Sequence, residues 1–88
     1  MMELYTINQV SKLYGISTRM LYYYEKIGLI SSLRKSEYAY RVYDETALLR
    51  LQQILILRKL RIPMKQIHII LNNAQTTEAI DLFVHSIQ

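Results

Sequence analysis

Residues 16–29 read ISTRMLYYYEKIGL, and this stretch decides the fold. Ser17 can cap a helix, because its hydroxyl can accept a hydrogen bond from a backbone N–H of the first turn. At about 100° per residue, the residues that follow divide into two arcs. We therefore predict an amphipathic helix over residues 17–27, with Tyr24 in the core, Tyr22 facing outward and Tyr23 at the border. The inner arc holds Met20, Leu21, Tyr24 and Ile27, and the outer arc holds Thr18, Arg19, Tyr22 and Lys26.

A second short helix is predicted just before it. Thr6 and Gln9 have the spacing of a capping box, in which each side chain accepts a hydrogen bond from the other residue's backbone N–H. Ile7 and Val10 then follow at helical spacing, and Gly15 stands where a left-handed residue commonly ends a helix. Two short helices joined by a tight turn predict a helix-turn-helix over residues 6–25.

A hairpin and two further helices are predicted downstream. Within LISSLRKSEYAYRVY, residues 29–43, the segments 33–35 and 40–43 can pair as a short β-hairpin, or wing, over residues 33–43. Asp44 can cap a third helix over residues 44–60, and Pro63 can open a fourth over residues 63–71. The predicted fold class is therefore mainly α, a winged helix-turn-helix.

The predicted third helix is apolar on two sides, and such a helix must be covered on two sides. One stripe can pack on the first two helices, whereas the other needs the fourth helix or a second chain. A protein-interaction module that uses this helix therefore stays open as an alternative function. The first stripe is Ala47, Leu48, Leu51, Ile54 and Leu55, and the second is Leu49, Ile56 and Leu60.

Composition excludes several classes of protein. With 88 residues the chain is one domain, and without cysteine it has neither a disulfide framework nor a thiol nucleophile. Two histidines and scattered carboxylates offer no metal site and no catalytic constellation, so we expect no metal, no cofactor and no enzymatic activity. The apolar runs are too short for a transmembrane helix, and we expect no contact with a membrane.

Charge points to a polyanionic partner. The net charge is +4, and residues 46–71 carry five basic side chains and no acidic one. Six tyrosines lie between Tyr22 and Tyr43, interleaved with Arg34, Lys35 and Arg41. Basic side chains supply charge and tyrosine hydroxyls can donate to phosphate, so this pattern favours nucleic acid.

Three ordered motifs resemble the DNA-binding domain of the MerR (mercury-resistance regulator) family of bacterial transcription regulators. The wing motif is YRVY at residues 40–43, and residues 51–67 read LQQILILRKLRIPMKQI, similar to the helix pair that follows in the family. This chain has Tyr22 where the family has a second arginine, Ala39 in place of a wing glycine and Arg61 in place of a helix-ending glycine. The recognition-helix motif matches at Ser17, Arg19, Leu21, Tyr23, Tyr24, Glu25, Gly28 and Leu29.

The resemblance implies sequence-specific binding to double-stranded promoter DNA, with helix 17–27 in the major groove and phosphates held by the hairpin wing and by a second, helical wing. Glu25 is expected to orient a neighbouring arginine. For Arg58 two roles stay open, a phosphate contact and a structural ion pair. Its stem is expected to be buried among apolar residues. The implied DNA-binding residues are Thr18, Arg19, Tyr22 and Tyr23 in the groove, Tyr40, Arg41 and Tyr43 on the wing, and Arg58 on the second wing.

The same resemblance implies the organisation of the chain and its partners. Residues 1–71 form the DNA-binding domain, and residues 72–88 form a linker and the opening turns of a dimerisation helix truncated at Gln88. The full-length protein is expected to be a homodimer, with this fragment weakly dimeric or monomeric. RNA polymerase is an indirect partner, and the location is cytoplasmic, at the nucleoid. A DNA-bending, excisionase-like protein is a closely related alternative.

Overall fold

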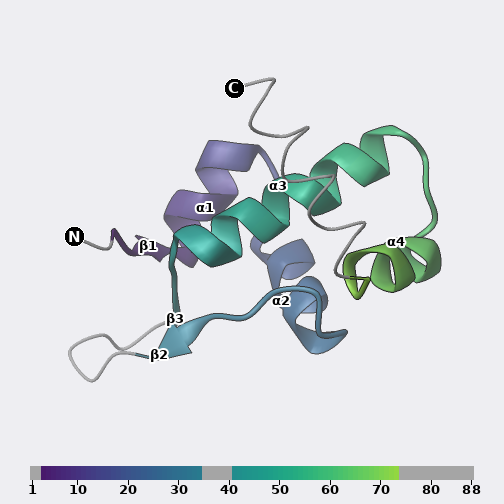
Figure 1. Cartoon of the computed structure of the whole chain (residues 1–88). Coiled ribbons are helices and arrows are strands. Elements are labelled where there is room, and N and C mark those ends of the chain that lie inside the picture. Colours follow the sequence, from purple (N-terminus) through teal and green to yellow (C-terminus); the bar gives the residue numbers. More distant parts are fainter. Residues whose placement is uncertain (1–2, 35–40, 74–88) are drawn as a thin grey trace. The chain divides into compact units, whose positions relative to one another are not determined.

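The computed structural model describes residues 3–34 and 41–73, and its architecture is mainly helical with a small sheet (Figure 1). The chain divides into two compact units, Met1–Leu48 and Leu49–Gln88. None of the helices in the described residues is long and apolar enough to cross a membrane. The helices are α1 (Ile7–Tyr14), α2 (Thr18–Lys26), α3 (Glu45–Lys59) and α4 (Met64–Leu71), and the strands are β1 (Tyr5–Thr6), β2 (Leu33–Arg34) and β3 (Arg41–Tyr43).

Local hydrogen bonds at their ends explain why α1, α2 and α3 form where they do. Thr6 and Gln9 make the predicted capping box, with the Gln9 backbone N–H 3.1 Å from Thr6 Oγ1 and the Thr6 backbone N–H 2.8 Å from Gln9 Oε1. Gly15 is left-handed, at φ 64°, and ends α1. Ser17 Oγ accepts the N–H of Met20 to begin α2, and Asp44 Oδ1 accepts the N–H of Ala47 to begin α3. The predicted helix-turn-helix is confirmed.

The sheet has three antiparallel strands in the order β1-β3-β2. Leu33 pairs with Val42 and Arg34 with Arg41, which confirms the predicted hairpin where the chain is described. Tyr40 and Ala39 lie outside the described residues. Strand β1 was not predicted, because two residues are too few to show an alternating pattern and Tyr5 becomes a strand residue only by pairing with Tyr43.

The core of the first unit lies where α1 packs on α2, β1 and β3. Tyr24 is completely buried, as its place on the inner arc of the helix predicts. Burying a large apolar side chain contributes about 1.5–3 kcal/mol each, so this core holds the recognition helix and the hairpin in one unit. Its other buried residues are Ile7, Val10, Leu21, Leu29, Ile30, Val42, Tyr43, Ala47 and Leu48.

In the second unit, Arg50 of α3 donates from Nη1 to the carbonyl oxygen of Leu71, at 2.9 Å, and so satisfies the C-terminal end of α4. Both apolar stripes of α3 are predicted to be covered, and in this unit the first stripe is buried at Leu51 and Ile54 and half-buried at Leu55. In the second stripe Leu49 and Ile56 are half-buried, while Leu60 is 66% exposed. The buried side chains of this unit are Leu51, Gln53, Ile54, Leu57, Ile67 and Leu71.

Candidate nucleic-acid interface

The outward face of α2 carries the residues that the helical arcs place there. Arg19 is exposed near the helix start, and Tyr22 and Tyr23 are 45% and 42% exposed. Thr18 is half-buried at the first position of the helix. In helix-turn-helix proteins the N-terminal residues of such a helix reach base edges in the major groove. The exposed face of α2 therefore combines a cation and two aromatic side chains where a duplex could be read.

The wing joins this face through Arg41 of β3. Its Cζ lies 4.7 Å from the centre of the Tyr22 ring, within the range of a cation–π contact. Its Nη1 lies 3.4 Å from Oε2 of Glu25, which is also on α2. The side chain of Arg41 remains 35% exposed. The wing and the exposed face of α2 therefore share one basic and aromatic surface.

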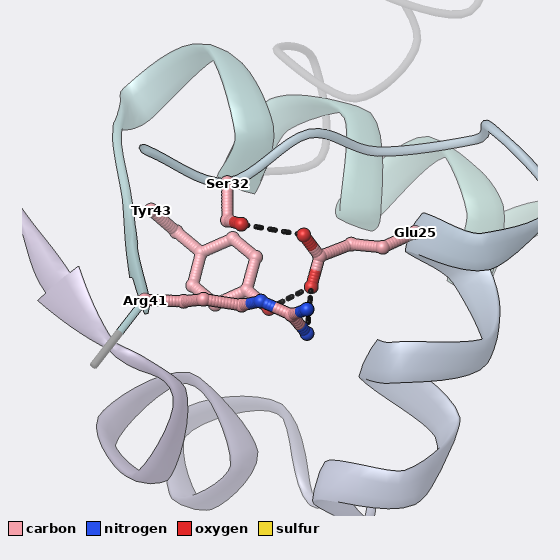
Figure 2. A network of polar contacts seen from close by, with 4 residues as sticks. All are labelled: Glu25, Ser32, Arg41 and Tyr43. Atoms are coloured by element: carbon pink, nitrogen blue, oxygen red, sulfur yellow. Dashed lines mark hydrogen bonds and ion pairs between the residues drawn. The ribbon is translucent and has the colours of Figure 1, made fainter. Parts of the chain in front are cut away.

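Glu25 is the centre of a polar network that spans α2, the segment after it and β3 (Figure 2). The hydroxyl of Ser32 donates to Oε1. The hydroxyl of Tyr43 donates to Oε2 at 2.8 Å, and Arg41 donates to the same oxygen. The predicted contact between Glu25 and a neighbouring arginine is present, and its role in orienting Arg41 stays a prediction. The part of Ser32 was not predicted, because a lone serine in a loop has no spacing that indicates its partner.

Tyr43 is buried, whereas the family resemblance implies a phosphate contact from this residue on the wing. It is 1% exposed, and its hydroxyl is directed at Glu25. Burial, followed by this hydrogen bond to a carboxylate, raises the pKa of Tyr43 well above its usual value. The expectation of a phosphate contact from Tyr43 does not fit this position, because its hydroxyl is enclosed. Tyr43 and Arg41 instead donate to the same carboxylate oxygen of Glu25.

The second unit carries its own basic group of side chains around the turn between α3 and α4. Arg58 is exposed, in contrast to the expectation that its stem is buried, because Leu57 takes the inward position of that turn. Four side chains there are both basic and exposed: Arg58, Lys59, Arg61 and Lys65.

Fold and site together define a winged helix-turn-helix. The sequence profile of the MerR HTH family of regulatory proteins matches residues 5–74. The chain therefore belongs to the MerR family of helix-turn-helix transcriptional regulators, as its motifs predict.

Two relatives are transcriptional regulators by name. The HTH-type transcriptional regulator SkgA of Caulobacter vibrioides is 46% identical over 66 residues, which cover 75% of this chain and 26% of the relative. The HTH-type transcriptional activator TipA of Streptomyces coelicolor is 35% identical over 69 residues, which cover 78% of this chain and 27% of the relative. The chain thus spans about a quarter of the length of these curated relatives.

Two solved structures are similar. The crystal structure of SkgA from Caulobacter crescentus matches with a TM-score of 0.75 and 36% identity, covering 98% of this chain and 67% of that one. HiNmlR, described as a MerR family regulator lacking the sensor domain, bound to promoter DNA, matches with a TM-score of 0.67 and 25% identity. That match covers 94% of this chain and 67% of HiNmlR.

Proposed function

We propose that this chain binds double-stranded promoter DNA in a sequence-specific manner, with α2 in the major groove and the wings on phosphates. The observation that carries the proposal is the contact between Arg41 of β3 and Tyr22 of α2, at 4.7 Å. It joins the wing to the exposed face of α2, which is the arrangement that a groove-reading helix with a flanking phosphate contact requires. The relative HiNmlR, which is bound to promoter DNA, supports the same reading.

Each residue has a distinct task in this proposal. Arg19 reads base edges, together with Thr18 and the exposed tyrosines of α2. Arg41 holds phosphate from the hairpin wing, and Tyr43 supports it from within the core. The residues proposed to contact DNA are Thr18, Arg19, Tyr22, Tyr23, Tyr40, Arg41 and Arg58.

The wider assembly follows the family pattern. In the proposal, residues 1–71 form the DNA-binding domain, and residues 72–88 lead into a dimerisation helix. Two chains bind a two-fold symmetric site in the full-length protein, which acts on RNA polymerase indirectly by altering the promoter. The protein works at the nucleoid in the cytoplasm and has no catalytic role.

Two substitutions with different expected outcomes test the proposal. Duplexes are first selected from a random library by binding to the chain, and affinity is then measured for the selected duplex and for unrelated duplexes. Arg19→Ala should weaken binding to the selected duplex most and so reduce discrimination, by about 1–3 kcal/mol if Arg19 makes a bidentate base contact. Arg41→Ala should weaken binding to all duplexes by a similar factor.

Lys12→Ala is the matched control, because Lys12 is exposed on α1. This substitution also removes one positive charge, at another place in the same unit. It should change affinity less than either arginine substitution. Equal losses on selected and unrelated duplexes for Arg19→Ala would contradict the base-reading role. Failure of the library to yield any bound duplex would contradict the function as a whole.

A protein-interaction module remains the second candidate, favoured by two large apolar side chains on the second unit. Leu60 is 66% exposed at the end of α3, and Ile69 is 59% exposed on α4. If interaction is the function, Leu60→Lys should abolish partner binding while Arg41→Ala leaves it unchanged. Gel filtration of both variants at several protein concentrations, beside the duplex assay, separates the two candidates.

A further inference from the structure

We propose that Tyr22 is a positioning residue that holds Arg41, through the face of its ring, in the orientation in which the wing meets DNA. The inference deepens the proposed function and rests on it for the DNA step. The contact itself is present in the protein without DNA. It requires an aromatic ring at position 22, because the guanidinium of Arg41 interacts with the face of that ring.

The geometry gives Arg41 two contacts on one helix. Tyr22 and Glu25 are three residues apart on α2 and therefore lie on the same side of it. The ring of Tyr22 lies 4.7 Å from Cζ of Arg41, and the carboxylate of Glu25 lies 3.4 Å from Nη1. Two contacts of different kinds restrict a long side chain far more than one does.

The ion pair with Glu25 does not fix Arg41 alone. Its 3.4 Å distance is long for a charge-assisted hydrogen bond, while Tyr43 donates to the same carboxylate oxygen at 2.8 Å. A partly exposed ion pair contributes little by itself, and a cation–π contact at an exposed site is of comparable strength. The ring of Tyr22 is therefore a necessary part of the support.

Holding the guanidinium in advance matters because ordering a flexible side chain on binding weakens affinity. Arg41 is anchored to α2, so its phosphate contact is set in register with the residues of α2 that face the groove. The role belongs to the aromatic face of Tyr22 rather than to its hydroxyl. Tyr22→Phe should therefore preserve the role, and Tyr22→Leu should remove it.

The first test is a double-mutant cycle on unfolding of the whole chain without DNA. Urea unfolding is measured for wild type, Tyr22→Leu, Arg41→Gln and the double variant. We expect a coupling of about twofold to fivefold in the unfolding constant for the cycle with Tyr22→Leu. The cycle with Tyr22→Phe should show almost no coupling, because phenylalanine keeps the aromatic ring. Coupling indistinguishable from zero in the cycle with Tyr22→Leu would overturn the contact.

The second test repeats the cycle with the selected duplex. Tyr22→Leu should weaken binding by a larger factor in the wild-type background than in the Arg41→Gln background, whereas Tyr22→Phe should change binding by the same factor in both backgrounds. Tyr22→Leu changes no charge, but it should make the decline of log K with log salt less steep, by up to about 0.9 in slope, because the phosphate contact of Arg41 is lost. Arg41→Gln should have the same effect on the slope. A merely structural role would not change this slope.

Tyr23→Leu is the matched control, because Tyr23 is similarly exposed on the same helix and its ring contacts Tyr24. Its effect on binding should add to that of Arg41→Gln. Additive effects of Tyr22→Leu and Arg41→Gln on binding, or a loss in Tyr22→Phe equal to that in Tyr22→Leu, would overturn the positioning role. Absence of duplex binding by the wild-type chain would overturn the proposed function, whereas the unfolding cycle still decides the contact.

Discussion

At the scale of single residues, the carboxylate of Glu25 organises the junction between helix and wing. It accepts hydrogen bonds from Ser32, Arg41 and Tyr43, which lie up to 18 residues away in the chain. A partly buried carboxylate is stable in such a place when donors satisfy it. The phenol of Tyr43 is the most deeply buried of these donors, so its protonation is tied to the stability of the unit.

Tyr43→Phe should make the free energy of unfolding fall less steeply as the pH becomes alkaline. The raised pKa means that the folded state keeps the phenol proton more tightly than the unfolded state. The stabilisation is therefore complete below the usual tyrosine pKa of about 10 and is lost as the pH rises above it. Urea unfolding between pH 7 and pH 10.5 should show that the free energy of unfolding declines more steeply with pH for wild type than for Tyr43→Phe.

The same variant should be less stable than wild type at pH 7, by about 1–3 kcal/mol, because it removes a hydrogen bond to a charged acceptor. All other titrating groups are common to the two proteins, so the difference between their pH profiles isolates Tyr43. Parallel profiles above pH 9 would show that the phenol does not titrate abnormally.

At the scale of elements, α2 and α3 end with the same hydrogen-bond pattern but with different residues. After α2, the backbone N–H groups of Gly28 and Leu29 donate to the carbonyl oxygens of Glu25 and Tyr24, respectively. After α3, the backbone N–H groups of Arg61 and Ile62 donate in the same way to the carbonyl oxygens of Arg58 and Leu57. This arrangement requires a left-handed residue, and φ is 81° at Gly28 and 61° at Arg61. Arginine is strained there, because its Cβ crowds the carbonyl oxygen.

Arg61→Gly should stabilise the protein by about 0.5–1 kcal/mol, because glycine adopts the left-handed conformation without that strain. The gain should appear as a higher midpoint in urea with an unchanged slope. Gly28→Ala is the reciprocal control. An added Cβ at Gly28 meets no atom within 4 Å, so its expected destabilisation comes from the backbone conformation alone. A neutral or destabilising Arg61→Gly would contradict the account.

At the scale of the whole molecule, charge is the property that most directly bears on the proposed function. The net charge is +4, and residues 46–71 carry no acidic side chain. The first unit presents Arg19 and Arg41, and the second presents the basic side chains around the turn between α3 and α4. Each unit therefore carries its own cations for a phosphate backbone.

Duplex affinity should fall steeply with salt. If each chain contacts about five phosphates, log K should decline with log salt at a slope of about −4 to −5, because each contact releases condensed counterions. Fluorescence anisotropy at several salt concentrations between about 50 and 200 mM measures the slope. A flat response would contradict an electrostatic interface on either unit.

Much of the fold could be predicted from the sequence because its signals are local. The caps at Thr6, Ser17 and Asp44 depend on bonds between residues three apart, and Gly15 acts at its own position. The burial of Tyr24 follows from the 3.6-residue period of one helix. Family motifs added the expectation that Arg41 belongs to the binding surface, which stays a prediction until DNA binding is measured.

The amino-acid sequence by itself determined the helices, their ends and the outward face of α2, because these depend on neighbours a turn or less away. Only the tertiary structure decided that Tyr5 joins the sheet, that Tyr43 is enclosed and that Arg41 lies over Tyr22. These three outcomes depend on which distant segments the folded chain brings together. No local period encodes that choice, because it is set by packing between elements.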